Sequence, residues 1–215
     1  YGKYVLQASP DDRFIGSAPL AFTFGLGGHV VFPFRIGATT IQLERLTPDD
    51  LLPAIEKYNA TVVFTAPTAY RAVTPHVGKH DISSLRKCVS AGEALPKATF
   101  EAWKKATGIT ILDGIGGTEM MHIFIGSPEA KVRGGSTGQP VPGYIAKVVD
   151  DNFNEVPRGT IGRLAVKGPT GCRYLADPRQ TKYVQHGWNF PGDTYVQDAD
   201  GYFWYQARSD DMIIS

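Results

Sequence analysis

Short apolar segments alternate with amphipathic ones between residues 36 and 119, and this alternation constrains the fold more than any other feature. Segments rich in β-branched residues predict strands at residues 36–44, 61–66, 85–91 and 109–114. Helical patterns separate these segments at residues 47–60, 67–77 and 96–108. Strands that alternate with helices at these lengths favour an α/β fold with a doubly wound, mostly parallel sheet.

Two of the predicted helices carry end signals. Thr47 is an expected N-cap, and Pro48 follows it as a first-turn proline. Pro96 opens the helix at residues 96–108, and Gly108 is expected to end it. These signals are local, so they predict helix boundaries independently of the rest of the fold.

The pattern changes after about residue 134. Short strand-like segments separated by Gly and Pro follow, and Asp200-Gly201 is a hairpin signal between two of them. We therefore expect an α/β subdomain at residues 1–134 and a small, mostly antiparallel, β-barrel-like subdomain at residues 135–215. The sequence has no internal repeat, which excludes a solenoid.

Composition excludes several classes of partner. The 22 basic and 21 acidic residues give a formal charge of +1, so there is no electrostatic reason to expect nucleic acid or an anionic membrane as a partner. Cys88 and Cys172 lie far apart and outside any metal-binding spacing, which favours two reduced thiols in a cytoplasmic protein. Glycines, His29 and Pro33 interrupt the apolar tract at residues 18–34, which we interpret as buried core and not as a membrane span.

The ends of the chain suggest an excised piece. The sequence begins at Tyr1 without a start methionine or a signal peptide, and it stops within the apolar run DDMIIS. Such a piece leaves homo-oligomerisation open, because it can expose surface that a longer chain buries.

Three loops rich in small and hydroxyl-bearing residues follow the predicted strands. They are residues 65–68 (TAPT), 90–93 (SAGE) and 113–119 (DGIGGTE). The carboxyl ends of parallel strands share one edge of a sheet, so we expect the three loops to line one crevice. This placement argues against a purely structural α/β domain.

The glycine-rich loop at residues 113–119 lacks both common nucleotide signatures. No Gly-x-x-x-x-Gly-Lys-Ser/Thr occurs, and Glu119 stands where the dinucleotide fingerprint needs a small residue. Its chemistry still fits phosphate, because glycines admit an anion to backbone N–H groups, Thr118 can donate a hydrogen bond, and Glu119 can hold a hard divalent cation. The alternative is a tight turn with a capping threonine.

Two other motifs could contact a nucleotide. Ala91 and Gly92 leave room for a flat ring beside Glu93, although the same residues fit a helix entry. Asp193 and Arg208 could share the two hydroxyls of a ribose, since a carboxylate accepts both and a guanidinium donates to either. For Arg208 the alternative is a solvated charge cluster with the aspartates that follow it.

Four motifs taken together carry a family resemblance: SAGEALP, DGIGGTEMMHIF, GDTYVQDADGYFWYQARSDDMI and PLAFTFGLGGHVVFPFRIGAT. In this order they resemble the acyl- and aryl-CoA ligase branch of the adenylate-forming enzymes, with benzoate-CoA and 2-aminobenzoate-CoA ligases the most similar subgroup. The resemblance covers nearly the whole chain. It implies an acid–thiol ligase that adenylates an aromatic carboxylic acid with ATP and Mg²⁺ and transfers the acyl group to coenzyme A.

The resemblance also implies roles for individual residues. It assigns the α-phosphate to Thr118 and the magnesium ion to Glu119, and it makes Asp210 the hinge of a small C-terminal domain. The adenine would lie between Ala91, Gly92 and Glu93 on one side and Asp113, Gly114 and Ile115 on the other, with the ribose on Asp193 and Arg208. The aromatic acid would contact Phe24, Gly25, Ile115, Gly116 and His122, with His29 nearby. The alternative is ordinary core packing for Phe24 and a half-buried histidine with satisfied hydrogen bonds for His122.

The sequence departs from the family at three of these places. Isoleucine replaces a common aromatic residue at position 115, Pro191 replaces a threonine, and Ala207 replaces a glycine. These changes affect specificity and fine geometry more than the reaction.

The resemblance further implies that a phosphate loop precedes Tyr1 and that a C-terminal domain with the adenylation lysine follows Ser215, so the isolated piece should be inactive. Two alternatives stay open: an adenylation domain that loads a carrier protein, and a non-catalytic adenylate-binding module. The second would expect Glu119 or Asp193 to be lost, and both are present.

Overall fold

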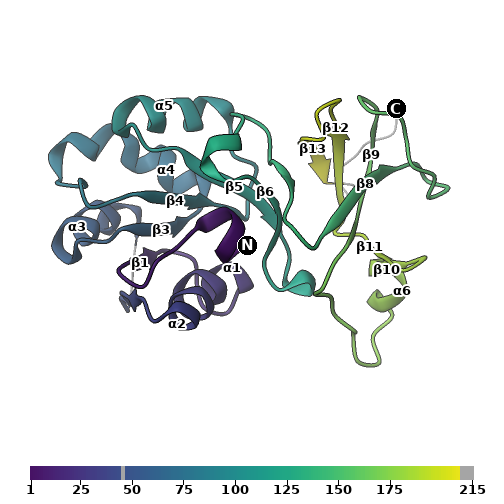
Figure 1. Cartoon of the computed structure of the whole chain (residues 1–215), viewed down its shortest axis with the longest axis horizontal. Helices are drawn as coiled ribbons and strands as arrows, with labels where there is room; N and C mark the ends of the chain where they lie inside the picture. The colour runs from purple at the N-terminus through teal and green to yellow at the C-terminus, as the bar shows by residue number, and fades with distance from the viewer. Residues whose placement is uncertain (45–46, 209–215) are drawn as a thin grey trace.

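The computed structural model describes residues 1–44 and 47–208, which form two β-sheets joined through β6 and β7 (Figure 1). The first sheet has seven strands in the order β2-β1-β3-β4-β5-β6-β7. Its strands are β1 (Arg13–Gly16), β2 (Thr39–Thr40), β3 (Val62–Thr65), β4 (Lys87–Ser90), β5 (Ile111–Gly116), β6 (Ile123–Gly126) and β7 (Gln139–Pro140). The strands from β2 to β5 are parallel, and β6 and β7 are antiparallel. The predicted mostly parallel sheet is therefore confirmed.

Helices cover both faces of this sheet, as expected for a doubly wound fold (Figure 1). The helices are α1 (Thr23–Leu26), α2 (Phe32–Ile36), α3 (Pro48–Tyr58), α4 (Pro67–Val73) and α5 (Lys97–Thr107). On one face, α3, α4 and α5 pack on the alternate strand residues Ile15, Val63, Cys88 and Ile111. On the other face, α1 and α2 lie over Phe14, Phe64, Val89 and Leu112. The period-two alternation of strand side chains assigns each residue to one of the two cores.

The predicted helix ends are confirmed. Thr47 is the N-cap of α3, and its backbone N–H donates to the Asp50 carboxylate at 3.0 Å. Gly108 ends α5 with a φ of 75°, a left-handed conformation that favours glycine. The helix predicted at residues 67–77 is α4 followed by a 3₁₀ turn, Thr74–Lys79.

The second sheet is antiparallel throughout. Its strands are β8 (Ile145–Val149), β9 (Ile161–Lys167), β10 (Val184–Gln185), β11 (Trp188–Asn189), β12 (Asp193–Gln197) and β13 (Phe203–Arg208), with α6 (Arg179–Tyr183) before β10. Strand β9 pairs with β8, β11 and β12, and the predicted hairpin joins β12 to β13 around Gly201. Phe124 and Ile125 of β6 pack against Val148, Leu164 and Phe203 of this sheet. The domain boundary at residue 134 stays a prediction.

Two sequence interpretations need correction. The strand expected at residues 36–44 is reduced to β2, and the sequence reading missed β1 altogether. The tract at residues 18–34 is only partly buried: its glycines, His29, Phe24 and Phe32 face the sheet, while five other bulky side chains point outward. The exposed fractions are 46% for Leu20, 62% for Phe22, 38% for Leu26, 50% for Val31 and 65% for Phe34.

Among the described residues no helix combines the length and apolar character needed to cross a membrane. Cys88 and Cys172 are both free thiols.

Candidate active site

The loops after β3, β4 and β5 meet at one edge of the first sheet, as their placement predicted. Ala66, residues 91–93 and residues 116–118 line the same pocket there. Thr68 bridges two of the loops, since its hydroxyl donates to the Glu93 carboxylate at 3.4 Å. Parallel pairing of β3, β4 and β5 brings these loops together even though they are distant in sequence.

The first pocket has a volume of ≈ 450 Å³ and mostly apolar walls. Seven of the residues predicted for ligand contact line it: Phe24, Ala91, Gly92, Glu93, Gly116, Thr118 and His122. The far wall is formed by Ser17, Ala18, Pro19, Phe22 and Thr23, which the sequence reading did not single out. A pocket of this size and lining suits a small, mostly apolar group.

His122 sits within a cluster of aromatic rings. Its ring centroid lies 4.7 Å from Phe32, 5.4 Å from Tyr1 and 5.9 Å from Phe24. Burial lowers the pKa of His122 to about 4, and the backbone of Phe24 opposes this effect only in part. His122 is therefore neutral at pH 7. A Cβ atom at Gly27 would lie 2.2 Å from the imidazole Cδ2, so glycine at that position leaves the ring its place.

The second pocket, of ≈ 400 Å³, lies between the two sheets. It brings together the predicted residues Gly92, Glu93, Asp113, Gly114, Ile115, Gly116, Asp193 and Arg208. Thr137, Tyr195 and Tyr205 also line it and were missed by the sequence reading. Tyr195 is buried on β12 between buried Thr194 and half-buried Val196, and Tyr205 is half-buried on β13, so no alternation of buried and exposed residues marks the two tyrosines.

Asp193 and Arg208 are direct partners in the register of β12 and β13. The guanidinium Nη1 donates to the Asp193 carboxylate at 3.2 Å and to the carbonyl oxygen of Pro191 at 3.0 Å. The pair is thus a fixed acceptor and donor at the pocket wall, which is the arrangement that two neighbouring hydroxyls need.

Asp113 has an unusual ionisation. Burial raises its pKa to about 8, while Ser90 and the backbone of Gly114 oppose the shift. One carboxyl oxygen is enclosed and has no hydrogen-bond partner among the described residues. At pH 7 the carboxyl is mostly protonated and can donate a hydrogen bond to a ligand in the second pocket.

The two pockets meet at three residues. Gly92, Glu93 and Gly116 line both, so a ligand in the first pocket and a ligand in the second would approach each other there. The absence of bulky side chains at Gly92 and Gly116 leaves this junction open. Thr118 lies beside it on the side of the first pocket.

Glu119 faces a different space from Thr118. Its carboxylate accepts a hydrogen bond from the Tyr174 hydroxyl, and both residues line a third pocket of ≈ 400 Å³ between β12 and α6. Four cationic side chains, Arg163, Arg179, Lys182 and Arg208, line this pocket together with the carboxylates of Glu119 and Asp193. Tyr174 was missed because it lies in an irregular segment with no recognisable pattern, 55 residues from its partner.

Two further predicted residues lie behind the first pocket. Gly25 is buried against the backbone of Ala18 and Pro19. His29 is buried with its ring edge-on to Phe64, at 6.3 Å between centroids. Asp210, the predicted hinge, falls outside the described residues.

Comparison with known proteins gives a consistent picture. The sequence profile described as AMP-binding enzyme matches residues 2–174. Benzoate–CoA ligase of Thauera aromatica is 36% identical over 99% of this chain, and the human mitochondrial acyl-coenzyme A synthetase ACSM3 is 34% identical over 100%. The chain spans only 42% and 38% of the lengths of these two relatives.

A solved structure extends the similarity to three dimensions. The anthranilate CoA ligase AuaEII, crystallised in complex with anthranoyl-AMP, superimposes on 100% of this chain with a TM-score of 0.95 and 42% identity. The chain covers 42% of that protein. The resemblance that the four sequence motifs suggested is thereby confirmed, and the chain belongs to the AMP-binding enzyme family.

Proposed function

We propose that this chain carries the acyl and nucleotide sites of an ATP-dependent aryl-CoA ligase, which adenylates a benzoate- or 2-aminobenzoate-like acid and transfers its acyl group to coenzyme A. The observation that carries the proposal is the junction of the two pockets at Gly92, Glu93 and Gly116. One pocket suits a small apolar group such as an aromatic ring, and the other offers an acceptor–donor pair for a ribose. The names of the benzoate and anthranilate relatives support the choice of acid and of acceptor.

In the first step, an oxygen of the substrate carboxylate attacks the α-phosphorus of ATP. A bond forms between that oxygen and phosphorus, and the bond to pyrophosphate breaks. Both reactants are anions, so catalysis requires donors that offset their repulsion. Thr118, which lies beside the junction, would donate its hydroxyl to the phosphate. In the second step the CoA thiol attacks the acyl carbon, and AMP leaves.

Each pocket orients one reactant. Phe24 and neutral His122 wall the aromatic ring without adding a charge to the apolar pocket. Asp193 and Arg208 hold the ribose, and protonated Asp113 and Ile115 lie against the adenine. Holding the two reactants at one junction replaces a costly bimolecular encounter.

The described residues fit a magnesium ion that arrives with ATP. Residues 1–44 and 47–208 contain no cluster of three or more His, Cys, Asp or Glu side chains that could enclose a metal ion. Mg²⁺ commonly uses one or two carboxylates together with substrate phosphates and water, and Glu119 would supply that carboxylate. The ion would neutralise charge on the phosphates.

The 215-residue chain should have negligible turnover by itself, because it spans about two fifths of the relatives that it matches. Rapid ATP-dependent CoA ligation by this purified chain would contradict that expectation.

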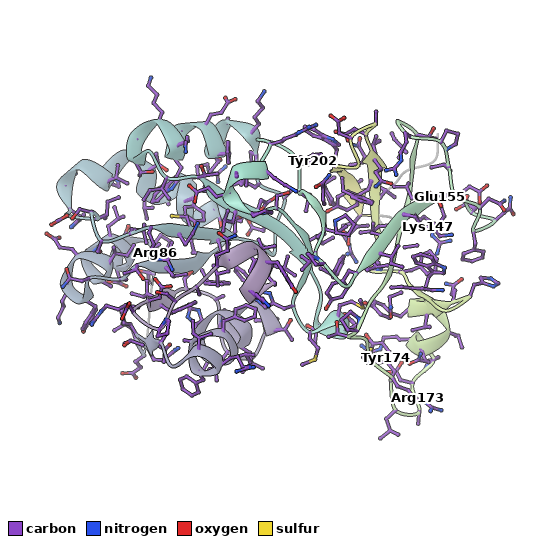
Figure 2. All side chains as sticks on the ribbon, viewed as in Figure 1. Arg86, Lys147, Glu155, Arg173, Tyr174 and Tyr202 are labelled. Atoms are coloured by element: carbon purple, nitrogen blue, oxygen red, sulfur yellow. The ribbon has the colours of Figure 1, made fainter. Side chains whose placement is uncertain are left out.

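The test is pyrophosphate exchange into ATP by the protein at its full natural length. Benzoate, 2-aminobenzoate, hydroxybenzoates and a short fatty acid are compared in wild type and in Glu119→Gln. We expect the aromatic acids to drive exchange and the variant to lose about 100-fold or more, the scale of a lost electrostatic contact in a transition state. Glu155→Gln is the matched control, since Glu155 is exposed and lies at the outer edge of the second sheet (Figure 2).

Three results would change the assignment. Exchange driven best by the fatty acid would replace the aromatic substrate class. Exchange without CoA ligation, but with loading of a carrier protein, would replace the acceptor. If no acid drives exchange, the adenylate-binding module becomes the better description. If Glu119→Gln exchanges pyrophosphate as fast as Glu155→Gln, Glu119 does not hold the magnesium ion.

A further inference from the structure

The segment between β9 and α6 is fastened to the Thr118–Met120 turn at two points. The Thr170 hydroxyl donates to the carbonyl oxygen of Met120 at 2.7 Å, and the Tyr174 hydroxyl donates to the Glu119 carboxylate. Tyr144 lies within hydrogen-bonding distance of Thr170, at 2.6 Å between the hydroxyl oxygens. The segment crosses from the second sheet to the turn that holds the predicted phosphate and magnesium residues (Figure 2).

Several contacts fix the direction of the Tyr174 phenol. The Arg179 guanidinium lies 4.7 Å from the ring centroid, and Tyr183 meets the ring edge-on at 6.2 Å. The Tyr174 backbone N–H donates to the Gln180 side chain at 2.7 Å. Arg179 is itself held by Asp177, with 2.6 Å between Nη2 and Oδ2. The hydroxyl therefore reaches Glu119 from a preorganised support.

The two oxygens of the Glu119 carboxylate point to different surroundings. Oε1 accepts the bond from Tyr174. Oε2 lies on the side of the glycine loop, since a Cβ atom placed on Gly117 would be 3.4 Å from it. Tyr174 thus binds one oxygen of the Glu119 carboxylate. The other oxygen faces the glycine loop, which is predicted to approach the phosphates.

We propose that Tyr174 is a positioning residue that holds Glu119 by one carboxylate oxygen and presents the other to the magnesium ion on ATP. The proposal rests on the function proposed above. A carboxylate that binds a metal is commonly oriented by a hydrogen bond to its second oxygen, and loss of such a partner costs about 10–100-fold in metal affinity or activity. Without Tyr174, Glu119 would be free to rotate toward the arginines of the third pocket.

The test compares Tyr174→Phe with Tyr202→Phe in the protein at its full natural length. Tyr202 is a close match: its hydroxyl donates to the carbonyl oxygen of Lys131 at 2.9 Å, and the Arg133 guanidinium lies 3.9 Å from its ring. Figure 2 shows the two tyrosines well apart. Each variant therefore loses one hydrogen bond and keeps one arginine–ring contact.

Two quantities are measured besides thermal unfolding. Pyrophosphate exchange is titrated with Mg²⁺, and Mn²⁺ binding in the presence of a non-hydrolysable ATP analogue is followed by electron paramagnetic resonance. We expect Tyr174→Phe to raise the half-saturating Mg²⁺ concentration and to weaken Mn²⁺ binding by about tenfold. Tyr202→Phe should change neither, although both variants can unfold at a lower temperature.

The outcomes separate this proposal from the function on which it rests. If wild type neither exchanges pyrophosphate nor binds Mn²⁺ with the analogue, the proposed function fails and this proposal falls with it. If wild type and Glu119→Gln behave as expected but Tyr174→Phe retains normal metal dependence, only the positioning role is overturned. A loss of thermal stability alone in Tyr174→Phe would make the contact purely structural.

Discussion

His29 is a buried ionisable side chain without a counter-charge. It is 1% exposed, and neither ring nitrogen has a hydrogen-bond partner among the described residues. Burial lowers its pKa to about 4, whereas an unfolded histidine titrates near 6.5. Between those values the unfolded chain binds a proton that the folded chain does not, so the free energy of unfolding falls as the pH is lowered.

We therefore expect acidification from pH 7 to pH 4.5 to destabilise the wild type more than His29→Leu. One pH unit corresponds to about 1.4 kcal/mol, so the full interval for this residue is worth roughly 3 kcal/mol. Urea unfolding at the two pH values measures the difference. Equal losses in the two proteins would mean that His29 titrates in the fold much as it does in the unfolded chain.

At the level of elements, the turn after α5 offers a test of backbone conformation without any change in packing. A Cβ atom at Gly108 would meet nothing within 4 Å, yet this residue has a φ of 75°. We expect Gly108→Ala to lower the free energy of unfolding by about 1 kcal/mol, the cost of a left-handed conformation for a residue with a Cβ. Gly78→Ala is the control, since its Cβ would also meet nothing and its φ is not left-handed. Similar unfolding midpoints for the two variants would contradict this account.

The elements also show what local sequence can predict. Thr47 and Gly108 were correctly identified as helix ends because each acts through its own backbone neighbourhood. Strand β2 was overestimated because its length depends on pairing with β1, which no local pattern announced. The burial of residues 18–34 was overestimated for a similar reason: Phe24, Gly28 and Phe32 pack on Phe64 of the sheet, and no local pattern showed which other large side chains would face outward.

At the scale of the whole molecule, the second pocket draws residues from both sheets. Asp113 and Ile115 come from β5, while Asp193 and Arg208 come from β12 and β13. A nucleotide bound there would contact both, and ligand at 100 times its dissociation constant stabilises a fold by about 2.7 kcal/mol.

We therefore expect AMP to raise the unfolding temperature and to slow amide hydrogen exchange in β5 and β12 together. Asp193→Asn should weaken both effects, and Asp151→Asn, at an exposed position, should leave them intact. Protection confined to β5 would indicate that the second sheet takes no part in binding.

Topology explains how much of the candidate site could be predicted. The rule for parallel strands brought residues 91–93 and 113–118 together correctly, since it depends only on the order of strands and helices. Tyr174, Tyr195 and Tyr205 could not be found in this way. These tyrosines lie on or beside the second sheet. Side-chain packing positions that sheet on β6, and no rule of strand connection predicts such packing.

The two thiols differ in a way that has a practical use. Cys88 is fully buried and burial raises its pKa, whereas Cys172 is only half-buried and lies two residues from Tyr174. A maleimide dye added to the native protein should therefore label Cys172 and spare Cys88. The unmodified sequence thus provides one attachment point for a fluorophore, two residues from Tyr174.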